Sequence, residues 1–249
     1  TETTDMTTDK AISLIRGPKG STVTLTILRT GERTTREFKI VREDIEIPTI
    51  DTELRADGIF VIKFYSFSEN SANLFRGAIQ QFQTSGSSKL ILDLRGNPGG
   101  YLDSAVSIGS LFIDEGKTIV SEDFGTSRKP VVYRSRGPKL FNDKLNLIVL
   151  MDGGSASASE ILAGALREHK VATLVGTRTF GKGSVQELVS VTDDTSLKVT
   201  VAKWLTPNGL SISEQGLAPD VEVKFTEKDV EANRDPQLEK AVEILKARP

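Results

Sequence analysis

Short, mostly apolar runs separated by turn residues occupy the middle of the chain, and between them apolar residues recur with helical spacing. The runs predict buried strands at residues 59–64, 90–94, 145–151 and 171–175. The helical spacing predicts helices at residues 68–84 and 103–112, and a third that ends near residue 168. Strands that alternate with helices in this order predict an α/β core, in which helices cover a parallel or mixed sheet.

The beginning of the chain follows another pattern. Residues 9–16 predict a short helix, and the stretches 23–27 and 38–41 predict the two strands of a hairpin. One helix and one hairpin bury too little apolar surface to be stable alone. Residues 1–43 are therefore expected to be part of a small module, separate from a larger unit at residues 44–249.

The last part of the chain predicts two more strands and a terminal helix. Residues 185–191 and 197–205 show strand patterns, and a charged amphipathic segment is expected to be helical from about Pro236. No internal repeat is found. These elements extend the α/β core rather than forming a further domain.

Composition excludes several functions. The 249 residues include 32 basic and 34 acidic side chains, and the net charge of −2 gives no reason to expect nucleic acid or an anionic membrane as a partner. No apolar run approaches the roughly 20 residues of a membrane-spanning helix, and the polar stretch 1–10 does not resemble a signal peptide. The chain has no cysteine and one histidine, which excludes thiol catalysis, disulfides and metal sites built from cysteines or from several histidines.

Ser157 is a candidate nucleophile. It lies in the Gly-Ser turn 153–160, which follows a predicted strand and opens a predicted helix. The free N–H groups at a helix N-terminus favour negative charge that develops on a substrate carbonyl oxygen. The alternative is purely structural, because Ser157 and Glu160 have the spacing of a capping box. Ser155 and Ser159 remain rival nucleophiles at this stage.

Lys182 is a candidate general base for that serine. It lies 25 residues after Ser157, between Gly181 and Gly183. A lysine has an ordinary pKa of about 10.4, so a lysine base requires burial that favours the neutral form. The alternative is an exposed lysine in a glycine loop. His169 is a poor rival, because the twelve helical residues that separate it from Ser157 span roughly 18 Å.

Gly99 and Gly100 are candidates for one half of an oxyanion hole. They follow the predicted strand that ends near Arg95, and glycine allows backbone N–H groups to approach a ligand closely. An ordinary turn around Asn97 and Pro98 is the alternative. The segment lacks the spacing of a phosphate-binding loop.

Taken together, these segments resemble the carboxy-terminal processing proteases, also called tail-specific proteases, over nearly the whole chain. The matching motifs are residues 14–20 (LIRGPKG), 92–100 (LDLRGNPGG), 154–161 (GSASASEI), 180–183 (FGKG) and 216–220 (GLAPD). The resemblance implies a crotonase/ClpP-like protease core with a mixed sheet and covering helices at residues 44–249. It also implies that residues 1–43 are the second half of a PDZ domain, without the strand and carboxylate-binding loop that precede its helix.

The resemblance also assigns roles to individual residues. It implies a catalytic dyad of Ser157 and Lys182, and Gln186 occupies the place of a glutamine that supports the lysine. The implied oxyanion donors are backbone groups of Gly99, Gly100 and Ala158, and Arg16 is a candidate for coupling substrate capture to the active site. No metal or cofactor is implied.

The implied function is that of a serine endopeptidase that cleaves unstructured polypeptides near an apolar C-terminus. The family's usual location is extracytoplasmic: the periplasm, the cell surface or the thylakoid lumen. A homodimer or a regulatory partner is left open. Two alternatives are a non-catalytic binding or scaffold protein with a PDZ domain, and a crotonase-like acyl-transfer enzyme, for which the sequence shows no basic cluster to bind the phosphates of coenzyme A.

Overall fold

A computed structural model describes residues 2–3, 5–44, 48–142, 144–192, 194–213 and 215–248. The chain has two compact units, Thr1–Ile47 and Pro48–Pro249. The division falls four residues beyond the boundary expected from the sequence. Each unit is described by itself.

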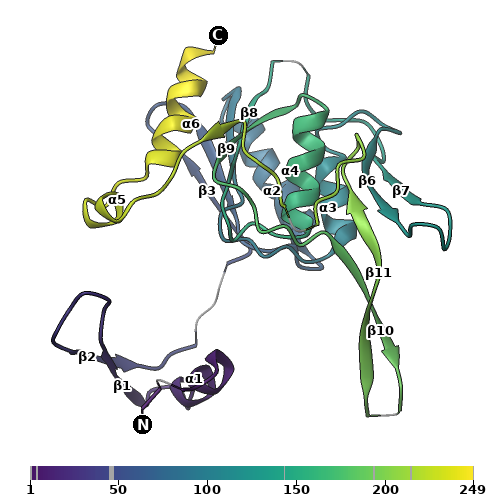
Figure 1. The fold of residues 1–249 in the computed structure, drawn as a ribbon. Coiled ribbons are helices and arrows are strands. Elements are labelled where there is room, and N and C mark those ends of the chain that lie inside the picture. Colours follow the sequence, from purple (N-terminus) through teal and green to yellow (C-terminus); the bar gives the residue numbers. More distant parts are fainter. Residues whose placement is uncertain are drawn as a thin grey trace. The chain divides into compact units, whose positions relative to one another are not determined.

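The first unit contains the predicted helix and hairpin (Figure 1). Helix α1 (Thr8–Ile15) precedes strands β1 (Thr22–Ile27) and β2 (Arg36–Val41), which pair antiparallel. Arg42 joins these parts, because its guanidinium donates to the carbonyl of Ile15 and to the hydroxyl of Ser21, both at 2.7 Å. Helix α1 buries none of its residues, in keeping with the small core expected of a helix and one hairpin.

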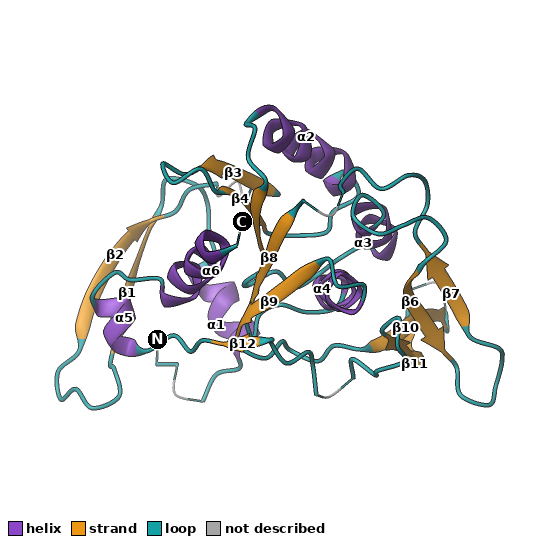
Figure 2. Cartoon of the chain, turned by 90° about the horizontal axis from the view of Figure 1, so that it is seen from above, coloured by secondary structure: helices purple, strands orange, loops and turns teal. Residues whose placement is uncertain are grey.

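A mixed six-stranded sheet forms the centre of the second unit (Figure 2). Its order is β12-β9-β8-β5-β4-β3, and every neighbouring pair is parallel except β3 with β4. The strands are β3 (Ile50–Leu54), β4 (Phe60–Phe64), β5 (Lys89–Asp93), β8 (Asn146–Met151), β9 (Ala172–Gly176) and β12 (Val221–Glu222). The α/β class predicted from alternating strands and helices is confirmed.

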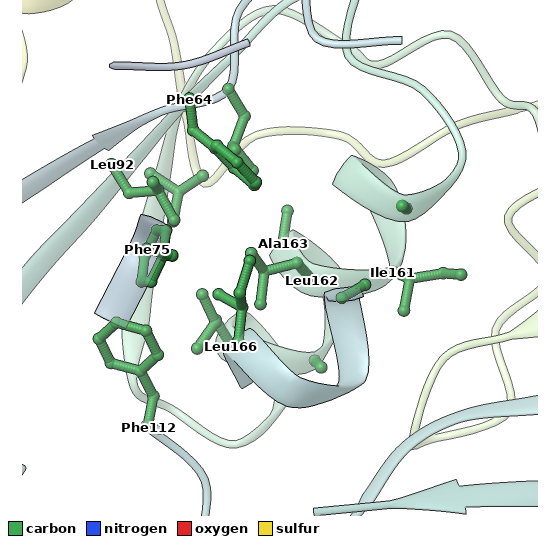
Figure 3. Packing of buried hydrophobic residues seen from close by; sticks show 14 of the residues in the cluster. Phe64, Phe75, Leu92, Phe112, Ile161, Leu162, Ala163 and Leu166 are labelled. Atoms are coloured by element: carbon green, nitrogen blue, oxygen red, sulfur yellow. The ribbon is translucent and has the colours of Figure 1, made fainter. Parts of the chain in front are cut away.

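Helices cover both faces of this sheet, which explains why its central strands are apolar at nearly every position. Helices α2 (Ser71–Thr84), α3 (Leu102–Gly109) and α4 (Ala158–Glu168) pack on one face, around Phe75, Leu92 and Leu166 (Figure 3). Helix α6 (Pro236–Ala247) packs on the other face. Successive residues of a strand point to opposite faces, so Leu92 faces α2 while Ile91 faces α6.

A second, four-stranded sheet has the order β10-β11-β6-β7 and is antiparallel throughout. Its strands are β6 (Thr118–Asp123), β7 (Val131–Arg134), β10 (Ser184–Ser190) and β11 (Ser196–Leu205). Strands β10 and β11 were predicted, whereas β3, β6, β7, β12 and the short helix α5 (Glu227–Glu231) were not. β7 and β12 are short, with four and two residues, and β3 and β6 carry polar residues at several positions, so none of them has the long apolar run on which the prediction depended.

An ion-pair network anchors the last helix to the sheet. Arg95, just after β5, donates to Asp93 and to both carboxylate oxygens of Asp235, the N-cap of α6, at 2.7–2.9 Å. Burial opposes ionisation of Asp235, but hydrogen bonds from Arg95 and from the N–H of Leu238 hold the pKa of this carboxyl below its usual value. This network fixes the start of the loop that leads to Gly99.

Two neighbours on α2 test the core directly. Phe75 is fully buried, whereas Leu74 is 44% exposed. We expect Phe75→Ala to lower the free energy of unfolding by about 3–5 kcal/mol, because it leaves a cavity. Leu74→Ala should change it by no more than about 0.5 kcal/mol. Urea unfolding followed by the fluorescence of Trp204, the only tryptophan, measures both; equal losses would contradict the packing.

The Asp235 network should make stability depend on pH. A carboxyl whose pKa is lowered by folding stabilises the folded state above its unfolded pKa, and this contribution is lost as the pH falls through the folded value. Asp235→Asn should therefore destabilise the chain at neutral pH, and the difference from the parent should shrink as the pH drops below about 4. Glu239→Gln, on the exposed side of α6, is the control. A difference that stays constant with pH would contradict the argument.

Candidate active site

The turn after β8 places Ser157 in an unusual backbone conformation. Ser157 is the N-cap of α4 and has a φ of 56° and a ψ of −115°. A positive φ is costly for any residue other than glycine and persists where the surrounding structure imposes it, often at functional sites. The side chain is half-buried. The conformation lets the chain turn sharply from strand to helix and presents Ser157 at the bend.

The two rival serines are occupied elsewhere. Ser155 and Ser159 are buried, and their hydroxyls donate to the carbonyls of Leu94 at 2.7 Å and of Asn97 at 2.9 Å. These bonds fasten the turn to the loop after β5. Ser157 differs from both: its side chain is only half-buried and is not bonded to that loop.

Glu160 connects the turn to the segment that carries Lys182. Its side chain is completely buried, and its carboxylate accepts four hydrogen bonds. One oxygen accepts from the N–H groups of Ser157 at 2.8 Å and Lys182 at 3.0 Å. The other accepts from the hydroxyl of Thr179 at 2.6 Å and the N–H of Gly181 at 2.8 Å. One side chain thus fixes the backbone of both candidate catalytic residues.

The capping-box pattern pointed to Glu160, but it predicted only one of the four hydrogen bonds that this side chain accepts. The bond from the Ser157 N–H is the one that the pattern predicts. The other three bonds come from residues 179–182, about twenty positions along the chain, and no local pattern reveals them. A capping box at the start of α4 and a nucleophilic role for Ser157 are therefore compatible.

The backbone of Lys182 is fixed while its side chain is exposed to solvent. Gly183 is required beside it, because a side chain there would come within 2.2 Å of the backbone nitrogen of Ser213. The burial expected of a lysine base is not found in this structure. Gln186 is also exposed, at a bulge in β10. Within the described residues, no hydrogen bond joins Gln186 to Lys182.

The Gly99–Gly100 segment lies against the turn. A Cβ atom on Gly99 would come within 2.8 Å of the nitrogen of Ala158 and 2.9 Å of the Cβ of Ser157. Gly99 has a φ of 93° and its N–H donates to the side-chain oxygen of Asn97 at 2.9 Å. Among the hydrogen bonds of the described residues, none uses the N–H of Gly100 or of Ala158 as donor. The N–H groups of Gly100 and Ala158 therefore have no acceptor among the described residues, whereas that of Gly99 is engaged by Asn97.

The remaining candidates lie away from this turn or in the other unit. His169 is the C-cap of α4, and its Nε2 is 2.7 Å from the carbonyl oxygen of Thr118. It lies at the opposite end of the helix from Ser157, as predicted. Arg16 ends α1 in the first unit, and its coupling role stays a prediction.

The described part of the chain has neither a membrane-spanning helix nor a cluster of metal-binding side chains. None of its helices is both long enough and apolar enough to cross a membrane. The same residues contain no group of three or more histidine, cysteine or acidic side chains placed to hold a metal ion.

The fold is shared with a known class of proteases. The sequence pattern of Peptidase family S41 matches residues 58–223, and the chain belongs to this family. The predicted membership of the carboxy-terminal processing proteases is thereby confirmed at the level of the family.

Named relatives agree with this assignment. The chain is 38% identical over 220 residues to the carboxy-terminal processing protease CtpA of Bacillus subtilis, covering 88% of this chain and 46% of that protein. It is 37% identical over 222 residues to a carboxy-terminal-processing protease of Bartonella bacilliformis, covering 88% and 50%. The chain thus spans about half the length of these curated relatives.

Solved structures show the same fold. The photosystem II D1 C-terminal processing protease is similar with a TM-score of 0.71 and 28% identity, over 88% of this chain and 60% of that one. Mature CPAF shares the fold with a TM-score of 0.65 and 15% identity, over 93% and 67%.

Replacing the Glu160 carboxylate should release the Lys182 segment. In Glu160→Gln, one oxygen becomes an NH2 group that cannot accept the hydrogen bonds donated to it. We expect a loss of stability of about 1–3 kcal/mol and faster hydrogen exchange of the Gly181 and Lys182 amides. Glu168→Gln is a matched control at the other end of α4, where Glu168 accepts from Thr206 and Asn208. If both variants left the two amides equally protected, Glu160 would not hold this segment.

Proposed function

We propose that this chain is the catalytic part of a serine endopeptidase that uses a dyad of Ser157 and Lys182. The observation that carries the proposal is the buried Glu160 carboxylate, which binds the backbone N–H groups of both residues. A carboxylate that accepts from both segments keeps the serine and the lysine loop next to each other. Family membership supports the peptidase class.

The proposed reaction assigns one role to each group. Neutral Lys182 accepts the proton of the Ser157 hydroxyl as Ser157 attacks the scissile carbonyl carbon, and Gln186 orients the lysine. The N–H groups of Gly100 and Ala158, in the segments that flank Ser157, donate to the oxyanion. Lys182 returns the proton to the leaving amine, and water then hydrolyses the acyl-enzyme.

The exposure of Lys182 suggests when the dyad becomes active. An exposed lysine is hydrated and holds its proton, whereas a lysine covered by a bound polypeptide loses that hydration. In this proposal the substrate itself buries Lys182 as it binds over the turn. The resting chain then has its catalytic backbone assembled and the Lys182 side chain in water.

The substrate class and the location come from the relatives and the resemblance. The names of the relatives specify carboxy-terminal processing, which supports cleavage of unstructured polypeptides near an apolar C-terminus. Residues 1–43 would act as the second half of a PDZ domain, with Arg16 as a link to the catalytic unit. An extracytoplasmic location remains part of the proposal.

Three variants test the dyad. The chain, Ser157→Ala, Lys182→Ala and Lys182→Arg are incubated with an unfolded protein that has an apolar C-terminal tail, and the fragments are identified by mass spectrometry. We expect cleavage by the parent and a loss of at least a hundredfold in all three variants. Lys182→Arg is the decisive control, because arginine keeps the positive charge but cannot accept the proton.

Each other outcome has a definite meaning. If Lys182→Arg cleaves as fast as the parent, the lysine contributes charge and not base catalysis. If Ser157→Ala cleaves as fast as the parent, the cleavage does not depend on Ser157, the serine is structural, and the dyad is wrong.

A further inference from the structure

Strands β10 and β11 form a two-stranded ribbon for most of their length. β11 pairs with β6 only through Lys203–Leu205, so the rest of the hairpin has no third strand and projects from the unit (Figure 1). Two-stranded ribbons are marginally stable in water. This ribbon therefore depends on its own cross-strand contacts unless something else pairs with it.

The outer edge of β10 offers unpaired backbone groups. β10 is the terminal strand of its sheet, and no strand in the described part of the chain pairs with that edge. The N–H of Val191 donates to Thr195 at 2.9 Å, so by antiparallel alternation Val189 and Glu187 also direct their backbone groups toward β11. Leu188 and Ser190 consequently direct their N–H and C=O groups outward.

This edge lacks the usual protection against pairing. Natural edge strands are commonly blocked by lysine, proline or an inward-pointing charge. β10 contains no lysine or proline, its single charged residue is Glu187, and its bulge lies near the base of the ribbon, between Val185 and Gln186. The seven-residue strand is open to a further strand along its outer part.

One face of the ribbon is exposed and mostly apolar, with Glu187 as a charged residue toward its base. Val189 lies directly opposite Leu197, and Val191 and Val199 are on the same face by strand alternation. Their exposed fractions are 45% for Val189, 57% for Leu197, 65% for Val191 and 37% for Val199. An added strand with apolar residues at alternate positions would extend this face and bury part of it.

The ribbon begins at the candidate active site. β10 starts two residues after Lys182, and the intervening Gly183 accepts a hydrogen bond from the N–H of Trp204 at 2.7 Å. A chain that pairs with β10 is thereby led to the catalytic lysine. Since β10 runs away from Lys182, an antiparallel partner runs toward it.

We propose that the outer edge of β10 binds the substrate by strand addition, as an extended antiparallel segment on the N-terminal side of the scissile bond. The proposal rests on the proposed function, because it identifies the occupant as the polypeptide to be cleaved. The segment exchanges backbone hydrogen bonds with Leu188 and Ser190 and places alternate side chains beside Val189 and Val191. Its C-terminal end passes over Lys182 and covers it.

Antiparallel pairing predicts which substrate N–H groups donate hydrogen bonds to β10. In an antiparallel pair, residues that exchange both hydrogen bonds have side chains on the same face. Substrate residues whose N–H groups face β10 therefore have side chains on the Leu188 face. Residues on the apolar face, beside Val189, direct their N–H groups away from β10.

The test uses Ser157→Ala and an unstructured peptide in which valine and threonine alternate ahead of an apolar C-terminal tail. The valines should occupy the apolar face. Methylation of the threonine amide nitrogens should weaken binding at least tenfold, whereas methylation of the valine amides, the matched control, should change it less than twofold.

In the NMR spectrum, bound peptide should slow hydrogen exchange of the Leu188 and Ser190 amides at least tenfold, with the Glu187 and Val189 amides as internal references.

Several results would overturn the proposal. They are equal effects of the two methylation patterns, unchanged exchange at Leu188 and Ser190 with saturating peptide, and no binding of the peptide. Protection that increases with protein concentration in the absence of peptide would instead assign the edge to a second copy of the chain. Because Ser157→Ala is tested for binding alone, a peptide that pairs with β10 but is not cleaved by the parent would contradict the proposed function and not this inference.

Discussion

The Glu160 carboxylate is the interaction on which the candidate site depends. It is buried without solvent access, and a buried carboxylate is tolerated only when its oxygens are fully hydrogen-bonded. Four donors from two separate segments meet this requirement. Each segment is consequently restrained by the other through this one side chain.

The surrounding structure supplies the rest of this restraint. Ser155 and Ser159 join the turn to the loop after β5, and Gly99 approaches so closely that no side chain fits there. The sheet places the ends of β5 and β8 side by side, because these strands are parallel neighbours. The site thus arises where three loops meet at the carboxyl edge of a parallel sheet, the usual position of ligand sites in such folds.

Much of this arrangement could be predicted from the sequence. Apolar runs located the central strands, and helical spacing located α2, α3 and α4, because burial on both faces leaves a strong pattern. The edge strand β3 was missed because its exposed positions carry polar residues, and β7 was missed because it has only four residues. The motifs identified Ser157 and Lys182 as candidates, but the wider role of Glu160 depends on contacts between distant segments. The exposure of Lys182 corresponds to the alternative that its glycine neighbours left open, whereas the burial expected of a lysine base was not found.

In the proposed reaction Ser157, and no neighbouring serine, becomes acylated with help from Lys182. The most direct measurement is mass spectrometry of the chain after an acid quench during turnover of an activated peptide ester. The account predicts an acyl group on the peptide that contains residues 155–159, assigned by fragmentation to Ser157, and its loss in Lys182→Ala. An acyl group on Ser155 or Ser159, or equal acylation of Lys182→Ala, would contradict it.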